Sequence, residues 1–411
     1  MKVDTMRAID YWVGVPLCLL LSLLDALLGA GRPPPRRPPK RVLFIELSEM
    51  GSAILADPAM RRARRHFGAD IFFAIFAANR PSLNLLHTIP ESNIFAFRSE
   101  KLWTLIADLI RFVFWSRRLS IDTVVDLELF SRVSALLARL SGAENRVGFH
   151  AFYNEGLYRG SLMTRRVAYN PHIHIAKNFV ALVMALEADD SQIPFTKRPV
   201  ADEDVRIARA VPAPEDIVRA RKSLAGACPA YRPESRLVLL NANGSALLPL
   251  RRWPADRYVE LARVILAGFA DAVAVFVGSS DEREECERLA GQVASDRCAS
   301  LAGTFRLEQL PALYSLASAM VSNDSGPVHF AAATDMPVVA LYGPETPVLY
   351  GPLGRGIALA AGLACSPCVS AANHRRTACT DNVCMQAIPV ARVFDSVAGI
   401  LREHPNRARG P

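Results

Sequence analysis

The segment VSNDSGPVHFAAATDMPVVALYGP, from Val321 to Pro344, decides the fold. Its pattern predicts a strand ending at Asn323 and Asp324, a Ser-Gly-Pro turn, and a helix starting near Pro327. The first N–H groups and the dipole of such a helix attract a diphosphate, and a carboxylate beside them can accept a hydroxyl. The alternative is an ordinary capped turn with a core histidine. The candidate binding residues are Asp324, Ser325, Gly326 and His329.

Short β-branched or aromatic runs alternate with longer amphipathic runs on both sides of this segment. This βαβα order implies mostly parallel sheets covered by helices. The expected strands span 42–47, 71–76, 94–97, 124–129, 237–243, 273–278, 319–324 and 337–343. The expected helices span 99–118, 131–141, 254–269, 281–294 and 307–318.

A stretch rich in proline and charge interrupts the alternation and predicts a domain junction. The fold class is therefore α/β, with two Rossmann-like, doubly wound domains facing a cleft, where such folds bind nucleotides. The predicted parts are an N-terminal domain at 41–198, an interdomain linker at 199–235, a C-terminal domain at 236–388, and a helix with a tail at 389–411.

Residues 1–31 form a separate apolar segment, followed by a linker at 32–40. The run at 11–30 is interrupted by one charge, at Asp25, and is close to the length that spans a bilayer. GRPPPRRPPKR, which follows Ala30, is basic and favours the cytoplasmic side of the membrane. The sequence therefore predicts a protein on the cytoplasmic face of a membrane, with 11–30 either spanning it or lying in it.

Composition excludes several classes of protein. With 411 residues, 51% of them hydrophobic and 21% charged, the chain is neither disordered nor fibrous. The net charge of +8 is concentrated near the N-terminus, which suits an anionic membrane surface better than a nucleic acid. We therefore expect a membrane surface as a partner and no nucleic acid.

The segment at 321–344 resembles the signature of glycosyltransferase family 9, the lipopolysaccharide heptosyltransferases. NANGSALLPLRRWPADRYVELA at 241–262 and FVGSSDEREECERLA at 276–290 are similar to the phosphate-side and ribose-side stretches of the family. RVLFIELSEMGSAILADPAMRRARRHF at 41–67 resembles its opening strand, glycine loop and helix. The resemblance covers about 41–388 and implies a GT-B architecture.

In this family the C-terminal domain holds a nucleotide-activated sugar. By position, the resemblance implies that Arg251 faces the diphosphate and that Phe305 lies near the base pocket. The loop beside them contains Asn243, Gly244 and Ser245. An arginine binds phosphate without titrating, so no divalent metal or other cofactor is required. We assign Arg252 to a solvated role.

The opening loop departs from the family pattern, which has Gly-Asp with the Asp as general base. This chain has Gly51-Ser52, and a serine needs a base of its own. Glu49 is the predicted substitute base, with Ser52 beside it; the alternative is a surface Glu49 in a protein that binds sugar nucleotide without turnover. Asp57 precedes Pro58 and is expected to cap a helix.

RVGFHAFYNEG at 146–156 and NPHIHIAKNF at 170–179 occupy positions where the family contacts acceptors. His150, Tyr153, His172 and His174 are acceptor-side candidates, with structural roles as the alternative.

Four cysteines gather in CSPCVSAANHRRTACTDNVC, at Cys365, Cys368, Cys379 and Cys384. Four thiolates can form a structural zinc site, and disulfides or free thiols are the alternatives. Inside the same loop, His374, Arg375 and Arg376 are candidates for gripping an anionic substrate.

The resemblance implies an enzyme: an inverting, metal-independent glycosyltransferase. It would move a sugar, with heptose as the candidate, from a nucleotide-diphosphate sugar to a lipopolysaccharide or lipid-linked acceptor. The alternatives are a non-catalytic sugar-nucleotide-binding protein and a GT-B-like epimerase or hydrolase.

Overall fold

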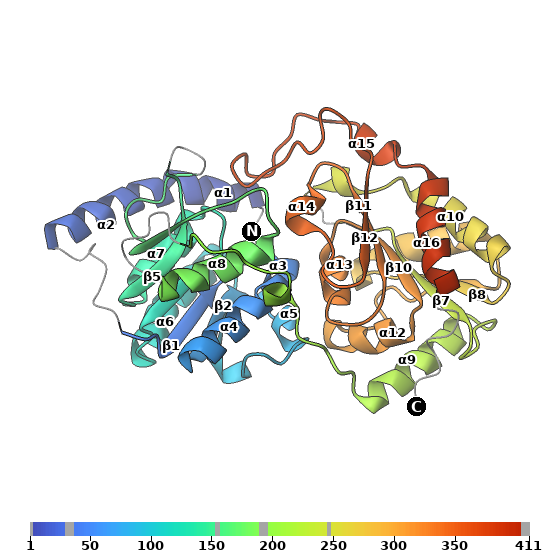
Figure 1. Ribbon diagram of the computed structural model, residues 1–411, viewed down its shortest axis with the longest axis horizontal. Helices are drawn as coiled ribbons and strands as arrows, with labels where there is room; N and C mark the ends of the chain where they lie inside the picture. Colours follow the sequence, from blue (N-terminus) through green and yellow to red (C-terminus); the bar gives the residue numbers. More distant parts are fainter. Residues whose placement is uncertain (1–2, 29–36, 153–156, 189–195, 245–247, 404–411) are drawn as a thin grey trace. The chain divides into compact units, whose positions relative to one another are not determined.

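A computed structural model describes residues 3–28, 37–152, 157–188, 196–244 and 248–403 (Figure 1). The chain divides into two compact units. Unit 1 comprises Met1–Arg206 with Ala371–His374, and unit 2 comprises Ile207–Ser370 with Arg375–Pro411. The change of unit after Arg206 falls inside the predicted linker at 199–235.

Unit 1 contains a six-stranded sheet in the order β3-β2-β1-β4-β5-β6, and every neighbouring pair is parallel. The strands are β1 Arg41–Ile45, β2 Asp70–Phe76, β3 Ile94–Phe97, β4 Thr123–Asp126, β5 Asn145–His150 and β6 Arg165–Ala168. β1 and β4 are buried along nearly their whole length, as expected for strands covered on both faces.

The helices of unit 1 cover both faces of this sheet. They are α1 Val3–Trp12, α2 Gly14–Leu28, α3 Met50–Leu55, α4 Asp57–Phe67, α5 Pro81–Asn84, α6 Leu102–Arg118, α7 Arg132–Leu140 and α8 Ile175–Glu187, with short 3-10 turns η1 Ala77–Asn79, η2 Glu91–Asn93 and η3 Glu203–Val205. One hydrophobic core cluster joins Leu43 and Ile45 of β1 to Phe112 of α6, Ala135 of α7 and Cys18 of α2. These three helices therefore lie on the same face of the sheet.

Unit 2 repeats this topology with the order β12-β11-β10-β7-β8-β9, again all parallel. Its strands are β7 Arg236–Asn241, β8 Ala272–Phe276, β9 Cys298–Ser300, β10 Ala319–Asn323, β11 Val338–Tyr342 and β12 Gly356–Ala360. Its helices are α9 Pro214–Ala227, α10 Ala255–Gly268, α11 Arg283–Val293, α12 Leu310–Leu316, α13 Gly326–Ala331, α14 Pro347–Tyr350, α15 Val383–Gln386 and α16 Val390–Glu403, with 3-10 turns η4 Pro249–Arg251, η5 Ser280–Glu282 and η6 Leu307–Gln309.

Both sheets place the first strand of the unit beside the fourth, which is the strand order of a doubly wound fold. The strand order reverses between β1 and β4 in unit 1 and between β7 and β10 in unit 2. Ligands of such folds bind at the carboxyl ends of the strands at this switch point. The predicted fold class is confirmed.

The elements differ from the prediction in two respects. The stretch at 199–235 is not a plain linker, because it contains the fourteen-residue helix α9. The sequence reading missed four strands, namely β5, β6, β9 and β12. The helix expected near Pro327 is confirmed: it begins at Gly326 and is six residues long.

The N-terminal segment packs on unit 1 instead of standing apart. α2 contacts α7, and Cys18 of α2 is fully buried in the core cluster named above. Thr5–Leu28 is long and apolar enough to cross a membrane, and 17% of its most apolar window is buried in the protein. Asp25, which the sequence presented as a flaw in a membrane span, is fully buried.

Candidate functional site

Asn323 joins the ends of the two central strands of unit 2. Its amide donates to the carbonyl oxygens of Ala242, at 2.9 Å, and Asn243, at 3.0 Å, both just beyond β7. Its oxygen accepts from the backbone N–H of Trp253, at 2.9 Å, and from the hydroxyl of Tyr258, at 3.1 Å. One buried side chain therefore fixes the loop after β7 against the end of β10.

A second polar network connects Asn241 to the Ser-Gly-Pro turn. The Asn241 amide donates to Oγ of Ser322, at 2.9 Å, and to Oγ of Ser325, at 3.0 Å. Ser325 precedes α13 in an extended conformation, φ −160° and ψ 171°. His329 is buried on α13, with 6% of its surface exposed. The Ser325 hydroxyl thus stabilises the turn through its hydrogen bond with Asn241. The burial of His329 matches the core-histidine alternative.

A cluster of charged side chains in unit 2 lies where β10 and β11 end. Nε of Arg251 lies 3.3 Å from a carboxylate oxygen of Asp324, and its NH2 lies 3.3 Å from Glu345. Arg375 approaches the same Glu345 oxygen at 3.8 Å and donates to the Tyr350 hydroxyl at 2.9 Å. The structure therefore brings together Arg251, Asp324 and Arg375, all candidates from the sequence, and adds Glu345, which the sequence analysis did not single out.

Both carboxyl groups are buried, Asp324 with 5% and Glu345 with 2% of its surface exposed. Burial raises the pKa of Asp324, against the charge of Arg251, which lowers it. Burial also raises the pKa of Glu345 to about 7, with Arg251 opposing the rise and Asp324 adding to it. The protonation of Glu345, and with it the net charge around Arg251, therefore changes near neutral pH.

The loop after β7 is held by its own contacts. The Asn243 amide donates to the carbonyl of Val277 at 3.0 Å, and the Gly244 carbonyl accepts from the Arg252 guanidinium at 2.7 Å. Arg252 is exposed, as its solvated assignment requires, and it also closes this loop. Phe305 is half-buried in the loop after β9. Ser245 lies outside the described residues.

In unit 1, Glu49 and Ser52 meet at the start of α3. Glu49 occupies the N-cap position, and the Ser52 hydroxyl donates to a Glu49 carboxylate oxygen at 3.0 Å. Ser52 is buried, with 6% of its surface exposed. Glu49 therefore lies beyond the carboxyl end of the first strand. Ser52, which stands where the family pattern has Asp, has a carboxylate partner.

The neighbouring strand contributes a second carboxylate that the sequence reading did not single out. Glu128, just beyond β4, accepts from the N–H of Leu47 at 2.8 Å and from the Ser48 hydroxyl at 3.0 Å. Burial raises the pKa of Glu128, and its hydrogen bonds with Leu47 and Ser48 oppose that rise. Glu128 thus holds the opening loop at the switch point of unit 1.

The acceptor-side histidines have local partners. Nδ1 of His174 accepts from the N–H of Ala176 at 3.1 Å, so this side chain caps α8. His150 ends β5, and its ring packs edge-on against Phe152. His172 is exposed. Tyr153 lies outside the described residues.

Asp57 does not cap α4, contrary to the prediction, because the N-cap residue is Ala56. The Asp57 carboxylate is fully buried and binds Arg61 Nε at 2.8 Å and the Thr88 hydroxyl at 2.7 Å. These contacts anchor the first turn of α4 to Thr88.

Within the described parts of the chain, no group of three or more His, Cys, Asp or Glu is arranged to hold a metal ion. All four loop cysteines are described, and none of them forms a disulfide. Cys368 Sγ lies 3.3 Å from the Thr377 hydroxyl, and Cys379 Sγ lies 3.5 Å from an Asp381 oxygen. The structural zinc site stays a prediction.

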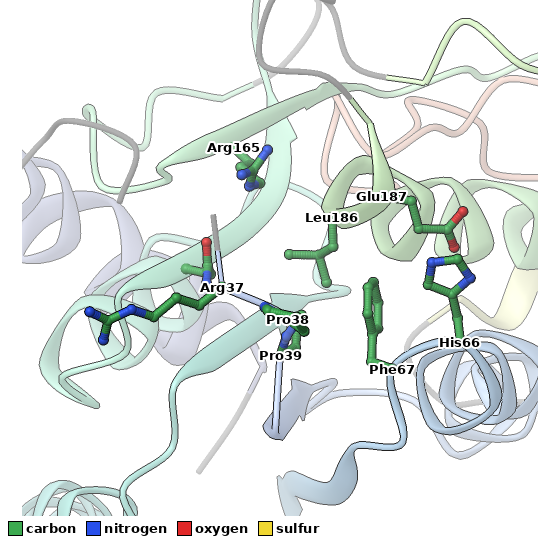
Figure 2. A pocket seen from close by; sticks show the side chains of 9 residues that line it. Arg37, Pro38, Pro39, His66, Phe67, Arg165, Leu186 and Glu187 are labelled. Carbon is green, nitrogen blue, oxygen red and sulfur yellow. The ribbon is translucent and has the colours of Figure 1, made fainter. Parts of the chain in front are cut away.

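A hollow of about 450 Å³ opens at the amino ends of the strands of unit 1 (Figure 2). Its lining includes Arg37 and Pro39 before β1, Phe67 at the end of α4, Arg165 at the start of β6 and Glu187 at the end of α8. It therefore lies at the opposite edge of the sheet from Glu49 and Glu128. We assign it no part in the site.

Two doubly wound units in one chain are the architecture of the GT-B fold. Structures of that class align over nearly their whole length. The Escherichia coli ADP-heptose lps heptosyltransferase II gives a TM-score of 0.66 at 21% identity, covering 88% of this chain and 99% of that one. A glycosyl transferase of family 9 from Veillonella parvula also gives a TM-score of 0.66 at 21% identity, covering 89% of this chain and 98% of that one.

Residues 117–378 match glycosyltransferase family 9 (heptosyltransferase), and the chain belongs to this family. Lipopolysaccharide heptosyltransferase 2 of Salmonella typhimurium is 38% identical over 27% of this chain and 32% of its own. Lipooligosaccharide heptosyltransferase 2 of Haemophilus ducreyi is 30% identical over 46% of this chain and 53% of its own. The matched stretch thus spans a third to a half of these relatives. Glu49 and Ser52 precede the residues matched to the family.

Proposed function

We propose that this protein is a heptosyltransferase that transfers a heptose from a nucleotide-diphosphate sugar to a lipopolysaccharide-type acceptor on the cytoplasmic side of the inner membrane. The observation that carries the proposal is the cluster of Arg251, Asp324 and Glu345 at the strand ends of unit 2, inside the range matched to the family. The relatives named above support heptose as the sugar and ADP as the nucleotide.

The donor would bind through the charged cluster. Arg251 supplies fixed N–H donors to the diphosphate, and Arg375 can add a second guanidinium. Asp324 accepts a hydroxyl of the sugar. A guanidinium stays charged when the leaving diphosphate gains negative charge, so this mechanism requires no divalent metal.

The acceptor would be activated in unit 1. Glu49 takes the proton from the acceptor hydroxyl, and Ser52 keeps the carboxylate oriented through its 3.0 Å hydrogen bond. The acceptor oxygen forms a bond to the anomeric carbon while the bond from that carbon to the phosphate oxygen breaks. The diphosphate leaves with the electron pair, and the anomeric configuration inverts.

Product formation from ADP-heptose and a heptose-deficient lipopolysaccharide tests this proposal. We expect Glu49→Gln to lower kcat by about 10²- to 10⁴-fold, the usual contribution of a general base, with donor binding unchanged. Glu91→Gln is the matched control, because Glu91 is an exposed carboxylate of the same unit, and it should have no effect. An unchanged rate in Glu49→Gln would remove Glu49 from the mechanism.

A thermal-shift series with ADP-, GDP- and UDP-sugars tests the donor site independently, because a ligand that binds only the folded state raises the melting temperature. If ADP-heptose stabilises the protein without turnover, the non-catalytic binding protein suggested by Gly51-Ser52 is favoured. Consumption of donor without acceptor would indicate a hydrolase or epimerase. No shift with any donor would contradict the assignment of Arg251 and Asp324.

A further inference from the structure

Helix α2 turns all its side-chain polar atoms toward unit 1. Only three of its fifteen residues, Cys18, Ser22 and Asp25, carry such an atom. Cys18 is fully buried, the Ser22 hydroxyl accepts from the Ser161 N–H at 2.8 Å, and the Asp25 carboxylate binds Arg139 at 2.6 Å and 2.8 Å. Gly14 continues this face and lies against Arg132, with no room for a Cβ.

The opposite face of α2 is apolar and open. Leu20 is 52% exposed, Leu23 55% and Leu27 83%, and these leucines lie roughly opposite Cys18 on the helical wheel. At the α1–α2 junction, Trp12 is 75% exposed. In a soluble monomer such a run of exposed leucines marks a site of contact with a membrane or another protein.

Helix α6 carries a second apolar stripe. Its core-facing residue, Phe112, is fully buried, whereas Trp103 is 80% exposed, Ile110 56% and Phe114 72%. At 3.6 residues per turn these three lie within about 20° of the direction opposite Phe112. The stripe therefore points directly away from the sheet of unit 1.

The two stripes belong to one surface. α7 contacts both α2 and α6, and Cys18 and Phe112 share one core cluster on one face of the sheet (Figure 1). The residues opposite them point outward from that face. With neighbouring helices about 8 to 10 Å apart, the stripes run about 20 Å apart along a common side of the unit.

The charge around these stripes is basic. On and just before α6, four cationic side chains are exposed: Lys101, Arg111, Arg117 and Arg118. Asp25 of α2 is bound to Arg139 and Asp10 of α1 to Arg132, and Glu100, just before α6, is an exposed acidic group beside the four cations. Aromatic and leucine side chains with a basic border complement the interface of an anionic bilayer.

We propose that α2 and α6 together form a docking surface for an anionic phospholipid bilayer, with α2 lying in the plane of the interface and not crossing it. Thr5–Leu28 is long enough to cross a bilayer, but the contacts of α2 with unit 1 hold its polar face against folded protein. Crossing would also separate Asp25 from Arg139 and uncover Cys18. The proposal goes beyond the proposed function, because it concerns unit 1 alone and needs no sugar donor.

Vesicle flotation of the full chain tests the surface. We expect binding to vesicles of phosphatidylglycerol and phosphatidylethanolamine, and weaker binding to phosphatidylcholine alone. Ile110→Glu with Phe114→Glu, and separately Leu23→Glu with Leu27→Glu, should each lower the partition coefficient at least tenfold. Val211→Glu with Val218→Glu is the matched control on unit 2, where both valines are exposed, and it should leave binding unchanged.

Three results would overturn the proposal. The α6 pair could bind vesicles as well as the unmodified chain, which would restrict docking to the N-terminal segment. Resistance to extraction at alkaline pH would show that the segment spans the membrane. If the unmodified chain is a dimer that binds no vesicles, and the substitutions on α2 or α6 make it a monomer, a second copy of the chain covers this surface. Circular dichroism confirms the folding of each variant, and the ADP-heptose thermal shift, which reports on unit 2, separates this test from that of the donor site.

Discussion

Replacing Arg251 tests the charge balance of the cluster that Arg251 forms with Asp324 and Glu345 in unit 2. In Arg251→Gln, Asp324 and Glu345 lose the guanidinium that lies 3.3 Å from each. Removing one partner of a buried ion pair costs about 3 to 5 kcal/mol when the remaining charge stays ionised. Here the carboxyl groups can instead bind protons, so we expect a smaller loss at low pH.

The pH dependence follows from the raised pKa of Glu345, about 7 with Arg251 in place. A folded-state pKa above the unfolded value costs stability as pH rises from the unfolded pKa through the folded one. Without Arg251 the pKa of Glu345 rises further, and one unit corresponds to 1.36 kcal/mol. At pH 6 Glu345 is already largely protonated, so the additional loss is small, whereas at pH 8 it should be about 1 kcal/mol.

Urea unfolding at pH 6 and pH 8 measures this difference. Trp253 is the one tryptophan in the sequence of unit 2, and it is buried beside Asn323, so its fluorescence reports on the site. Adding Glu345→Gln to Arg251→Gln should remove the pH-dependent part of the loss. Arg288→Gln, which removes an exposed arginine of the same unit, should have little effect. Equal losses at both pH values, or no rescue by the second substitution, would refute the reasoning.

Three further outcomes are expected. Asp25→Asn should lower the free energy of unfolding of unit 1 by about 1 to 3 kcal/mol, because Arg139 loses a charged partner, and loss of α2 protection in hydrogen exchange would check the cause. Asn323→Ala should cost about 2 to 3 kcal/mol in unit 2 by thermal melts, since it leaves the N–H of Trp253 and two carbonyls without this partner. If the four loop cysteines bind zinc, the purified chain should contain one metal per molecule and a chelator should make the thiols reactive; a metal-free chain with unchanged reactivity would favour free thiols.

The strand order of both units could be predicted in outline from alternating patterns, but the weaker elements could not. β6, RRVA, and β9, CAS, are short, so neither has enough β-branched residues to separate it from a loop. α9 was missed for a different reason. Pro214 was counted among the prolines of a linker, yet it is the first residue of the helix, where proline is favoured.

The donor site could be predicted in part. Asp324 was identified from the strand–turn–helix pattern and Arg251 through the resemblance to the family, whereas Glu345 follows β11 and has no such marker. Parallel neighbours end at the same edge of a sheet, and β11 pairs with β10. A carboxylate three residues beyond Tyr342 could therefore have been placed beside Asp324 from the strand pattern alone. What the sequence could not supply is the burial that raises the pKa of Glu345, because burial depends on the packing of several elements at once.

Asp25 shows most clearly how composition can mislead. By mean hydropathy the helix is almost uniformly apolar apart from one charge, because an average over residues ignores which face of the helix each side chain occupies. The residues that face unit 1, Gly14, Cys18, Ser22 and Asp25, recur at intervals of four, four and three, which is the spacing of one helical face. In lipid the polar groups of such a face would find no hydrogen-bond partners, whereas against a protein they can be paired and the small residues allow close packing. The periodicity therefore indicates a helix bound along its length to a folded unit, and Arg139, 114 residues away, is the partner that only the structure could identify.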